Sequence, residues 1–203
     1  MPDRMARPRR PGRAPGPRII AGAWRGRRLA APPGLSTRPT AERVRQALFD
    51  MLAHAPWAHS LGGGRAAIDG AQVLDAFAGT GALGLEALSR GAAEAVFLER
   101  DPAALATLRA NIAACGAGAR ARVLAVDARA APAGAACGLV FLDPPYGEGL
   151  IGMTVAHLAA RGWIAPGALV VAEMGREETP QPLGELLAER VHGAARIAVW
   201  RFG

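Results

Sequence analysis

The sequence predicts an α/β protein with a Rossmann-like, mostly parallel sheet of about seven strands and helices on both faces. Two features predict this fold class. An apolar run at residues 72–78 leads through a glycine loop into a helical pattern, and further apolar runs that end in an acid follow it. The chain has 203 residues, 51% of them hydrophobic, which is enough for one full core. No apolar stretch approaches the roughly 18 residues of a membrane span.

The composition divides the chain into a tail and one domain. Residues 1–17 are rich in Arg, Pro and Gly and are expected to form a disordered basic tail. A single domain is expected over residues 18–203. Within it, residues 18–58 should form a small N-terminal module and residues 69–203 the larger core.

The N-terminal module is predicted to contain a hairpin and a helix. Two short strand-like runs, residues 18–23 and 27–31, suggest a hairpin with Trp24 near its tip. Trp24 could stack on a nucleic-acid base or anchor the packing of the hairpin, and the sequence leaves both open. Thr40 is predicted to cap a helix whose apolar positions run from residue 44 to residue 52.

The glycine loop indicates a nucleotide-like cofactor. Residues 79–84 have the spacing G-x-G-x-x-G, and Glu99 lies about where a dinucleotide fingerprint has its ribose-binding acid. Asp75 favours a different cofactor. A carboxylate just before the glycines would repel a pyrophosphate, whereas it would attract the ammonium group of S-adenosylmethionine (SAM). The sequence therefore favours SAM, with a nicotinamide-dependent oxidoreductase as an alternative.

Four acids follow four apolar runs of the core. They are Asp75, Glu99, Asp127 and Asp143. In an open parallel sheet the carboxyl ends of the strands share one edge, where ligands bind. We expect Glu99 to accept from ribose hydroxyls and Asp127 from the adenine amino group. Asp101, which precedes a proline, is predicted to cap a helix instead.

The fourth acid opens the tetrad Asp143-Pro144-Pro145-Tyr146 at the end of a buried strand. An exocyclic amino group of a nucleobase has its lone pair delocalised into the ring, so attack on a methyl group requires acceptors on its hydrogens. Asp143 and the Pro144 carbonyl can supply them, because consecutive prolines fix φ and remove backbone donors. Tyr146 offers a face for stacking. The tetrad predicts a pocket for a planar amino group.

The remainder of the core completes the predicted sheet. Residues 150–161 have a helical pattern, and residues 168–173 form another buried strand. Residues 190–191 and 197–200 suggest a terminal strand pair.

These motifs resemble the RsmD family of bacterial 16S rRNA guanine-N2 methyltransferases, which are class I SAM-dependent enzymes acting on the small ribosomal subunit. The resemblance runs from about Arg18 to the C-terminus. Its most discriminating pieces are Arg18-Ile19-Ile20-Ala21-Gly22, Trp24-Arg25-Gly26-Arg27, and Arg38-Pro39-Thr40 with Arg43. The glycine loop and the tetrad, which occur in many amino-methyltransferases, complete it.

The resemblance, together with the residue patterns, implies three groups of site residues. The target base is expected at Asp143, Pro144, Pro145 and Tyr146. SAM is expected at Asp75, Phe77, Gly79, Thr80, Gly81, Glu99, Arg100, Asp127 and Ala128. RNA contacts are expected from Arg18, Trp24, Arg25, Arg27, Arg28, Arg38, Thr40 and Arg43. Transfer should be direct, with Asp143 orienting the amine of an unpaired or flipped base and no metal involved.

Charge placement supports a nucleic-acid partner. The 24 basic residues are all Arg, and 12 of them lie in residues 1–45 against two acids, which gives this stretch a net charge of +10. The remaining 12 Arg face 15 acids, a net charge of −3. Such asymmetry is typical of a basic arm on a near-neutral enzyme core, and 16S rRNA within the small subunit is the expected partner.

Cys115 and Cys137 have no metal or redox spacing, and the histidines are scattered, so we expect a cytoplasmic protein without a metal. No surplus apolar helix face stands out, so we expect a monomer. Two further alternatives to the rRNA methyltransferase stay open. One is an adenine-N6 or cytosine-N4 DNA methyltransferase, and the other is a non-enzymatic RNA-binding or ribosome-assembly protein.

Overall fold

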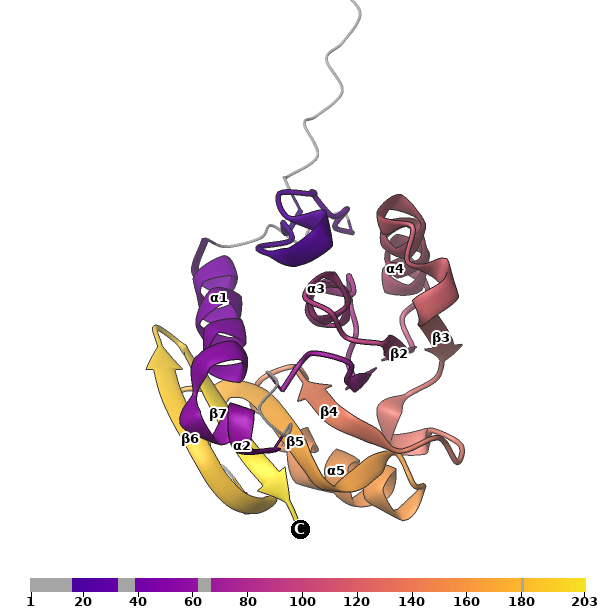
Figure 1. Cartoon of the computed structure of the whole chain (residues 1–203). Coiled ribbons are helices and arrows are strands. Elements are labelled where there is room, and N and C mark those ends of the chain that lie inside the picture. Colours follow the sequence, from indigo (N-terminus) through magenta and orange to yellow (C-terminus); the bar gives the residue numbers. More distant parts are fainter. Residues whose placement is uncertain (1–15, 33–38, 62–66, 180) are drawn as a thin grey trace, which may run out of the picture.

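The computed structural model describes residues 16–32, 39–61, 67–179 and 181–203, which form a seven-stranded sheet with helices on both faces (Figure 1). The sheet has the order β3-β2-β1-β4-β5-β7-β6. Its strands are β1 (Gln72–Asp75), β2 (Glu94–Glu99), β3 (Ala121–Ala125), β4 (Cys137–Leu142), β5 (Ile164–Gly175), β6 (Gly184–His192) and β7 (Ala195–Phe202).

Strands β1 to β5 run parallel, and β7 lies antiparallel between β5 and β6. The strand order therefore changes direction between β1 and β4, which is the point where open α/β sheets bind ligands. The predicted fold class, strand number and terminal strand pair are confirmed.

Helices cover the two faces of the sheet unequally. Helices α1 (Pro39–His54), α3 (Ala82–Ser89) and α4 (Pro102–Cys115) lie on one face, and α5 (Leu150–Ala160) lies on the other (Figure 1). A short helix, α2 (Pro56–Leu61), follows α1. Alternate strand residues point to opposite faces, so Phe97 belongs to the core under α3 whereas Leu98 belongs to the core with α5. None of the described helices is long and apolar enough to cross a membrane.

The N-terminal segment turns back on itself above α3 as a short antiparallel turn (Figure 1), in which the backbone N–H groups of Ile19 and Leu29 donate to the carbonyls of Arg27 and Pro17 at 2.9 and 2.8 Å. One antiparallel bridge joins Arg18 to Arg28, and a 3-10 helix, Gly22–Trp24, makes the tip. The backbone N–H groups of Ile20 and Ala21 donate to the Glu86 carboxylate of α3 at 2.7 and 3.0 Å, which docks the segment on the helix.

Two further predictions concern the region before α1. Thr40 is not an N-cap, because α1 begins at Pro39 and Thr40 lies inside the helix. Proline suits the first helical turn, where its missing N–H costs nothing. Arg38 and the predicted disorder of residues 1–15 lie outside the described residues.

Candidate active site

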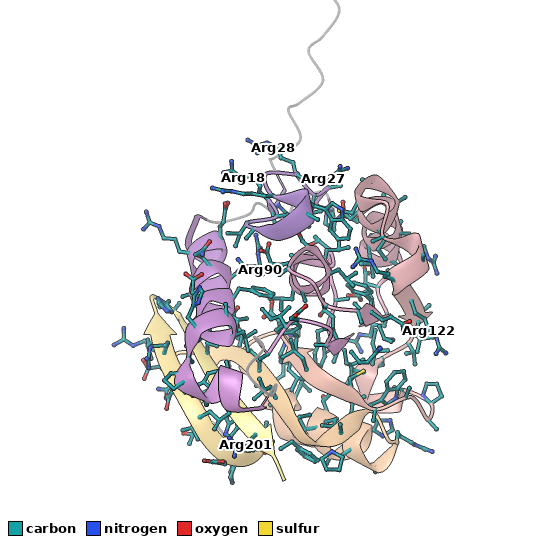
Figure 2. All side chains as sticks on the ribbon, in the orientation of Figure 1. Arg18, Arg27, Arg28, Arg90, Arg122 and Arg201 are labelled. Atoms are coloured by element: carbon teal, nitrogen blue, oxygen red, sulfur yellow. The ribbon has the colours of Figure 1, made fainter. Side chains whose placement is uncertain are left out.

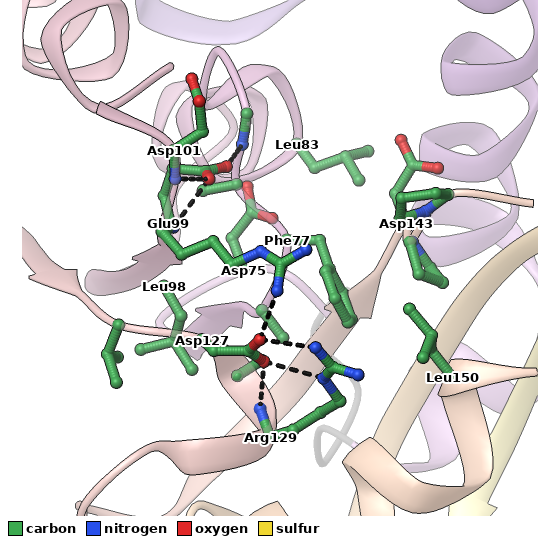
Figure 3. Close-up of a pocket in the computed structure, with 18 of the residues that line it drawn as sticks. Asp75, Phe77, Leu83, Leu98, Glu99, Asp101, Asp127, Arg129, Asp143 and Leu150 are labelled. Carbon is green, nitrogen blue, oxygen red and sulfur yellow. Dashed lines mark hydrogen bonds and ion pairs between the residues drawn. The ribbon is translucent and has the colours of Figure 1, made fainter. Parts of the chain in front are cut away.

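A cavity of about 530 Å³ opens at the carboxyl ends of β1, β2, β3 and β4, which the four predicted acids follow. Asp75, Glu99, Asp127 and Asp143 all line it, and the apolar part of its wall includes Phe77. In Figure 3, Glu99 and Asp127 lie on one side of the cavity and Asp143 lies on the other, with Phe77 between them. The other predicted site residues on this wall are Gly79, Thr80, Arg100, Ala128, Pro144 and Pro145.

The glycine loop is held by Asp75 at the end of β1. Gly84, in the first turn of α3, donates its N–H to Asp75 Oδ2 at 2.9 Å. A side chain at Gly84 would collide with the Phe97 ring, since its Cβ would lie 2.3 Å from a ring carbon. Gly81 has a φ of 79°, a conformation that L side chains rarely adopt, where it precedes α3. These two glycines let the loop and helix approach the strand ends closely.

Asp75 is 1% exposed, although it borders the cavity. Burial raises the pKa of its carboxyl group to about 7, although the hydrogen bond from the Gly84 N–H lowers this pKa. A cationic group in the cavity would favour the ionised form.

Replacing Asp75 by Asn provides a direct test of this buried charge. Well below pH 4 the wild-type carboxyl group is neutral in both the folded and the unfolded state. Between about pH 4 and pH 7 the Asp75 carboxyl group ionises in the unfolded chain but stays protonated in the folded one. This difference favours unfolding, so the wild type loses stability over this range, whereas the Asn variant does not. We expect D75N to be more stable above pH 7 by a few kcal/mol, at about 1.4 kcal/mol per pKa unit. Urea unfolding at pH 4 and pH 8 measures this difference, and equal stabilities at pH 8 would contradict it.

Glu99 organises the loop that follows β2. Its Oε2 accepts the N–H of Gly79 at 2.8 Å, and its Oε1 accepts those of Arg100 and Asp101 at 2.7 Å each. Asp101 is the N-cap of α4, as predicted, and accepts from the N–H of Ala104. Each carboxylate oxygen has about two acceptor positions, so Glu99 Oε2 keeps one for a ribose hydroxyl.

Asp127, by contrast, is fully engaged by arginines. Oδ1 accepts from the N–H and Nε of Arg129, and Oδ2 accepts from Arg129 and from Arg100 at 2.7 and 2.8 Å (Figure 3). The side-chain hydrogen bond from Arg129 is the main reason that the pKa of Asp127 is held well below its usual range. All four acceptor positions are filled, so Asp127 must release an arginine before it can accept from an adenine amino group.

Asp143 faces the cavity from the end of β4. Its side chain is open to the cavity, but protein atoms crowd the carboxyl group on its other sides. This desolvation, together with the nearby charges of Glu173 and Asp75, raises its pKa. Tyr146 is 48% exposed and lies outside the cavity wall, where its hydroxyl group donates to Glu173. Burial and this hydrogen bond raise the pKa of Tyr146, so its hydroxyl group stays a donor.

Among the residues that the structure describes, Arg18, Trp24, Arg25, Arg27, Arg28 and Arg43, which are predicted to contact RNA, lie apart from the cavity wall. Arg18, Arg27 and Arg28 gather on the N-terminal segment above α3 (Figure 2), and Arg25 is exposed on the same segment. Arg43 is exposed on α1. Several have protein partners: Arg18 pairs with Glu42 at 3.6 Å, and Arg27 donates to the Ala114 carbonyl.

Trp24 occupies a packing position in the N-terminal segment. It is half-buried against the core, its backbone N–H donates to Ser89 Oγ at 2.9 Å, and the Arg120 guanidinium lies 5.4 Å from its ring centre. Of the two roles open for Trp24, this geometry matches the packing anchor.

Sequence reasoning missed three residues that shape the site. Glu86 binds the N-terminal segment through two backbone hydrogen bonds, and Arg129 donates to the Asp127 carboxylate. The Glu86 contact had no signal in the local pattern, whereas Arg129 lies only two residues after Asp127. Glu173 had a signal as well, because it stands near the end of β5 as the other acids stand at the ends of their strands.

Comparison with known proteins agrees with this architecture. A family model described as conserved hypothetical protein 95 matches residues 17–201. The chain is 44% identical over 158 residues to ribosomal RNA small subunit methyltransferase D of Escherichia coli (strain K12), covering 77% of this chain and 73% of the relative.

Two solved structures are similar to the chain. The putative methyltransferase yhhF from Escherichia coli matches with a TM-score of 0.76 and 41% identity, covering 91% of this chain and 97% of that one. The T. thermophilus 16S rRNA N2 G1207 methyltransferase RsmC, in complex with AdoMet and guanosine, matches with a TM-score of 0.62 and 22% identity, covering 84% of this chain and 45% of that one. The second likeness bears on the fold alone.

The sheet order and its cavity define a class I methyltransferase fold. The chain belongs to the RsmD family of methyltransferases.

Proposed function

We propose that this protein transfers a methyl group from SAM to the exocyclic N2 of a guanine in 16S rRNA of the small ribosomal subunit. One observation carries the proposal. The Asp143-Pro144-Pro145 turn, suited to a planar amino group, opens on the same cavity as the acid and glycine series suited to SAM. The relatives' small-subunit rRNA substrate supplies the acceptor class.

The residues around the cavity fit SAM. Its volume of about 530 Å³ lies in the range of small-molecule sites, and its wall pairs apolar side chains with a few polar groups. Asp75 matches the ammonium group and Glu99 the ribose hydroxyls. The apolar slot formed by Phe77, Leu98 and Val126 matches an adenine ring. When bound there, SAM supplies an electrophilic methyl group.

The protein's own contribution is to orient the acceptor amine. Asp143 and the Pro144 carbonyl accept from the two amino hydrogens, which holds the nitrogen lone pair toward the cofactor side of the cavity. The proton becomes acidic only as the new C–N bond forms, so Asp143 serves as an acceptor that strengthens in the transition state. The ionised carboxylate is the stronger acceptor, because a protonated carboxyl group turns one of its oxygens into a donor.

The N-terminal segment is the proposed RNA-docking surface. Arg28→Ala removes an exposed cation there, and Arg122→Ala, on the edge strand β3, removes one elsewhere (Figure 2). Each phosphate contact contributes to the slope of log affinity against log salt, roughly 0.7 to 0.9 per phosphate. We expect R28A to weaken rRNA binding and flatten this slope, and R122A to leave both unchanged. Filter binding between 50 and 200 mM salt measures the affinity and its salt dependence. Equal slopes for the wild type, R28A and R122A would refute the docking surface.

The acceptor class is tested by methyl transfer itself. Labelled SAM is offered with small subunits from cells that lack this modification, with free 16S rRNA, or with DNA. Label in rRNA or in small subunits supports the proposal, and label in DNA alone overturns it. Absence of label in every acceptor, with SAM binding intact, favours a non-enzymatic RNA-binding protein.

A further inference from the structure

Two carboxylates at the end of β5 hold the loop that contains the acceptor tetrad. Tyr146 donates its hydroxyl hydrogen bond to Glu173 Oε1. The next residue, Gly147, donates its N–H to Glu178 Oε1 at 2.9 Å. The same Glu178 oxygen accepts the N–H of Gly175 at 2.8 Å, which fixes Glu178 to the last residue of β5. Successive residues of the loop are thus tied to one end of one strand.

The loop needs such restraint because its own chemistry does not supply it. The two prolines fix the first half, but Gly147 and Gly149 follow with φ values of 80° and 61°. Glycine at positive φ has a wide choice of conformations, which costs entropy when one is selected. Tyr146 is about half exposed, so packing alone does not fix its ring. The two glutamates are the contacts that determine where the second half of the loop lies.

We propose that Glu173 and Glu178 are positioning residues for the acceptor base, acting on Tyr146 and on the backbone that follows it. Glu173 fixes the rotation of the Tyr146 ring through its hydroxyl group. Glu178 fixes the peptide at Gly147 and thereby the exit of the loop. The inference rests on the proposed function, in which Tyr146 stacks on the base that Asp143 orients.

A double-mutant cycle between Glu173 and Tyr146 tests the first contact. Tyr146→Phe keeps the ring and removes the hydroxyl group, and Glu173→Ala removes its acceptor. Small misplacements of a reacting group are costly, so each variant should lower kcat about tenfold with the Kd for SAM unchanged. If Glu173 acts through the Tyr146 hydroxyl group, the double variant should match the worse single variant instead of multiplying the two losses.

The second contact has a rescue test and a matched control. Glu178→Gln keeps a carbonyl oxygen for the Gly147 N–H and should retain most of kcat, whereas Glu178→Ala should lose about tenfold. Glu177 lies in the same turn, is 94% exposed and pairs only loosely with Arg176 at 3.6 Å. Glu177→Gln should therefore behave as wild type.

Each outcome decides the inference. Non-additive losses in kcat, rescue by Gln and an unchanged Kd for SAM support it. Multiplicative losses, wild-type rates in E173A and E178A, or parallel losses of SAM affinity overturn it. Wild-type transfer to small subunits is measured in the same series, so failure of the proposed function shows as an inactive parent protein, whereas failure of the inference shows only in the variants.

Discussion

Replacing Asp143 by Ala is expected to lower kcat for methyl transfer by about two to four orders of magnitude while the Kd for SAM changes little. Asp143 lines the cavity opposite Glu99 and Asp127, so its loss removes an acceptor for the amine and leaves the cofactor side intact (Figure 3). Removing one preorganised group that stabilises charge in the transition state usually lowers kcat by an amount within this range. The variant also loses the orientation of the acceptor amine. Single-turnover methyl transfer and calorimetric SAM titration measure the two quantities separately.

Glu148→Ala is the matched control for this variant. It removes an exposed carboxylate from the same loop, and Glu148 lies outside the cavity wall. The rate should also depend on pH, because desolvation raises the pKa of Asp143 and the ionised form is the stronger acceptor for the amine. The wild-type rate should therefore rise with pH through a value above the ordinary range of an Asp side chain. An Asp143→Ala enzyme with near-normal turnover would remove Asp143 from the mechanism.

Replacing Glu86 by Ala is expected to lower the free energy of unfolding by about 3 to 5 kcal/mol, the usual cost of breaking a buried charged network. Glu86 is fully buried in α3 and accepts from the N–H groups of Ile20 and Ala21 and from Arg90 Nε at 2.7 Å. Its removal leaves a buried guanidinium and two backbone donors without their partner. Urea unfolding monitored by circular dichroism measures the loss.

The position of Glu86 predicts a second effect of the same variant, on RNA binding. Because Glu86 holds the segment that carries Arg18 and Arg28, the variant should lose rRNA affinity as well as stability. Glu94→Ala, which removes an exposed acid from the start of β2, should change neither. A loss of stability in E86A no larger than that in E94A would show that the buried network does not hold the N-terminal segment.

The placement of the four acids could be predicted from the sequence because it depends on one geometric rule. Parallel strands bring their carboxyl ends to one edge, so acids that follow apolar runs meet whatever their separation along the chain. The capping role of Asp101 was equally local, since it depends on the next three residues. Glu173 obeys the same strand-end rule and could have been found with it.

The partners of Glu86 could not be predicted, because they depend on how separate elements pack. Glu86 takes its backbone donors from residues 65 and 66 positions earlier in the chain, and no local period marks that contact. The same contact docks the N-terminal segment on α3. Asp127 is expected from the sequence to be open to adenine, yet Arg100 reaches it from the end of β2, and Arg129 reaches it from the 3-10 helix Ala128–Ala130 that follows it directly. Sequence patterns predict where a charged side chain lies, whereas tertiary packing determines its hydrogen-bond partners.

The central claim is that the tetrad presents a guanine N2 amine for methylation, and the identity of the methylated atom tests it most directly. Small subunits or rRNA treated with the protein and isotope-labelled SAM are digested to nucleosides and analysed by mass spectrometry. The account predicts labelled N2-methylguanosine, which disappears with Asp143→Ala and persists with Glu148→Ala. Labelled N6-methyladenosine or N4-methylcytidine would contradict the assignment of the acceptor, and label on a ribose hydroxyl or a base carbon would contradict the role of the tetrad itself.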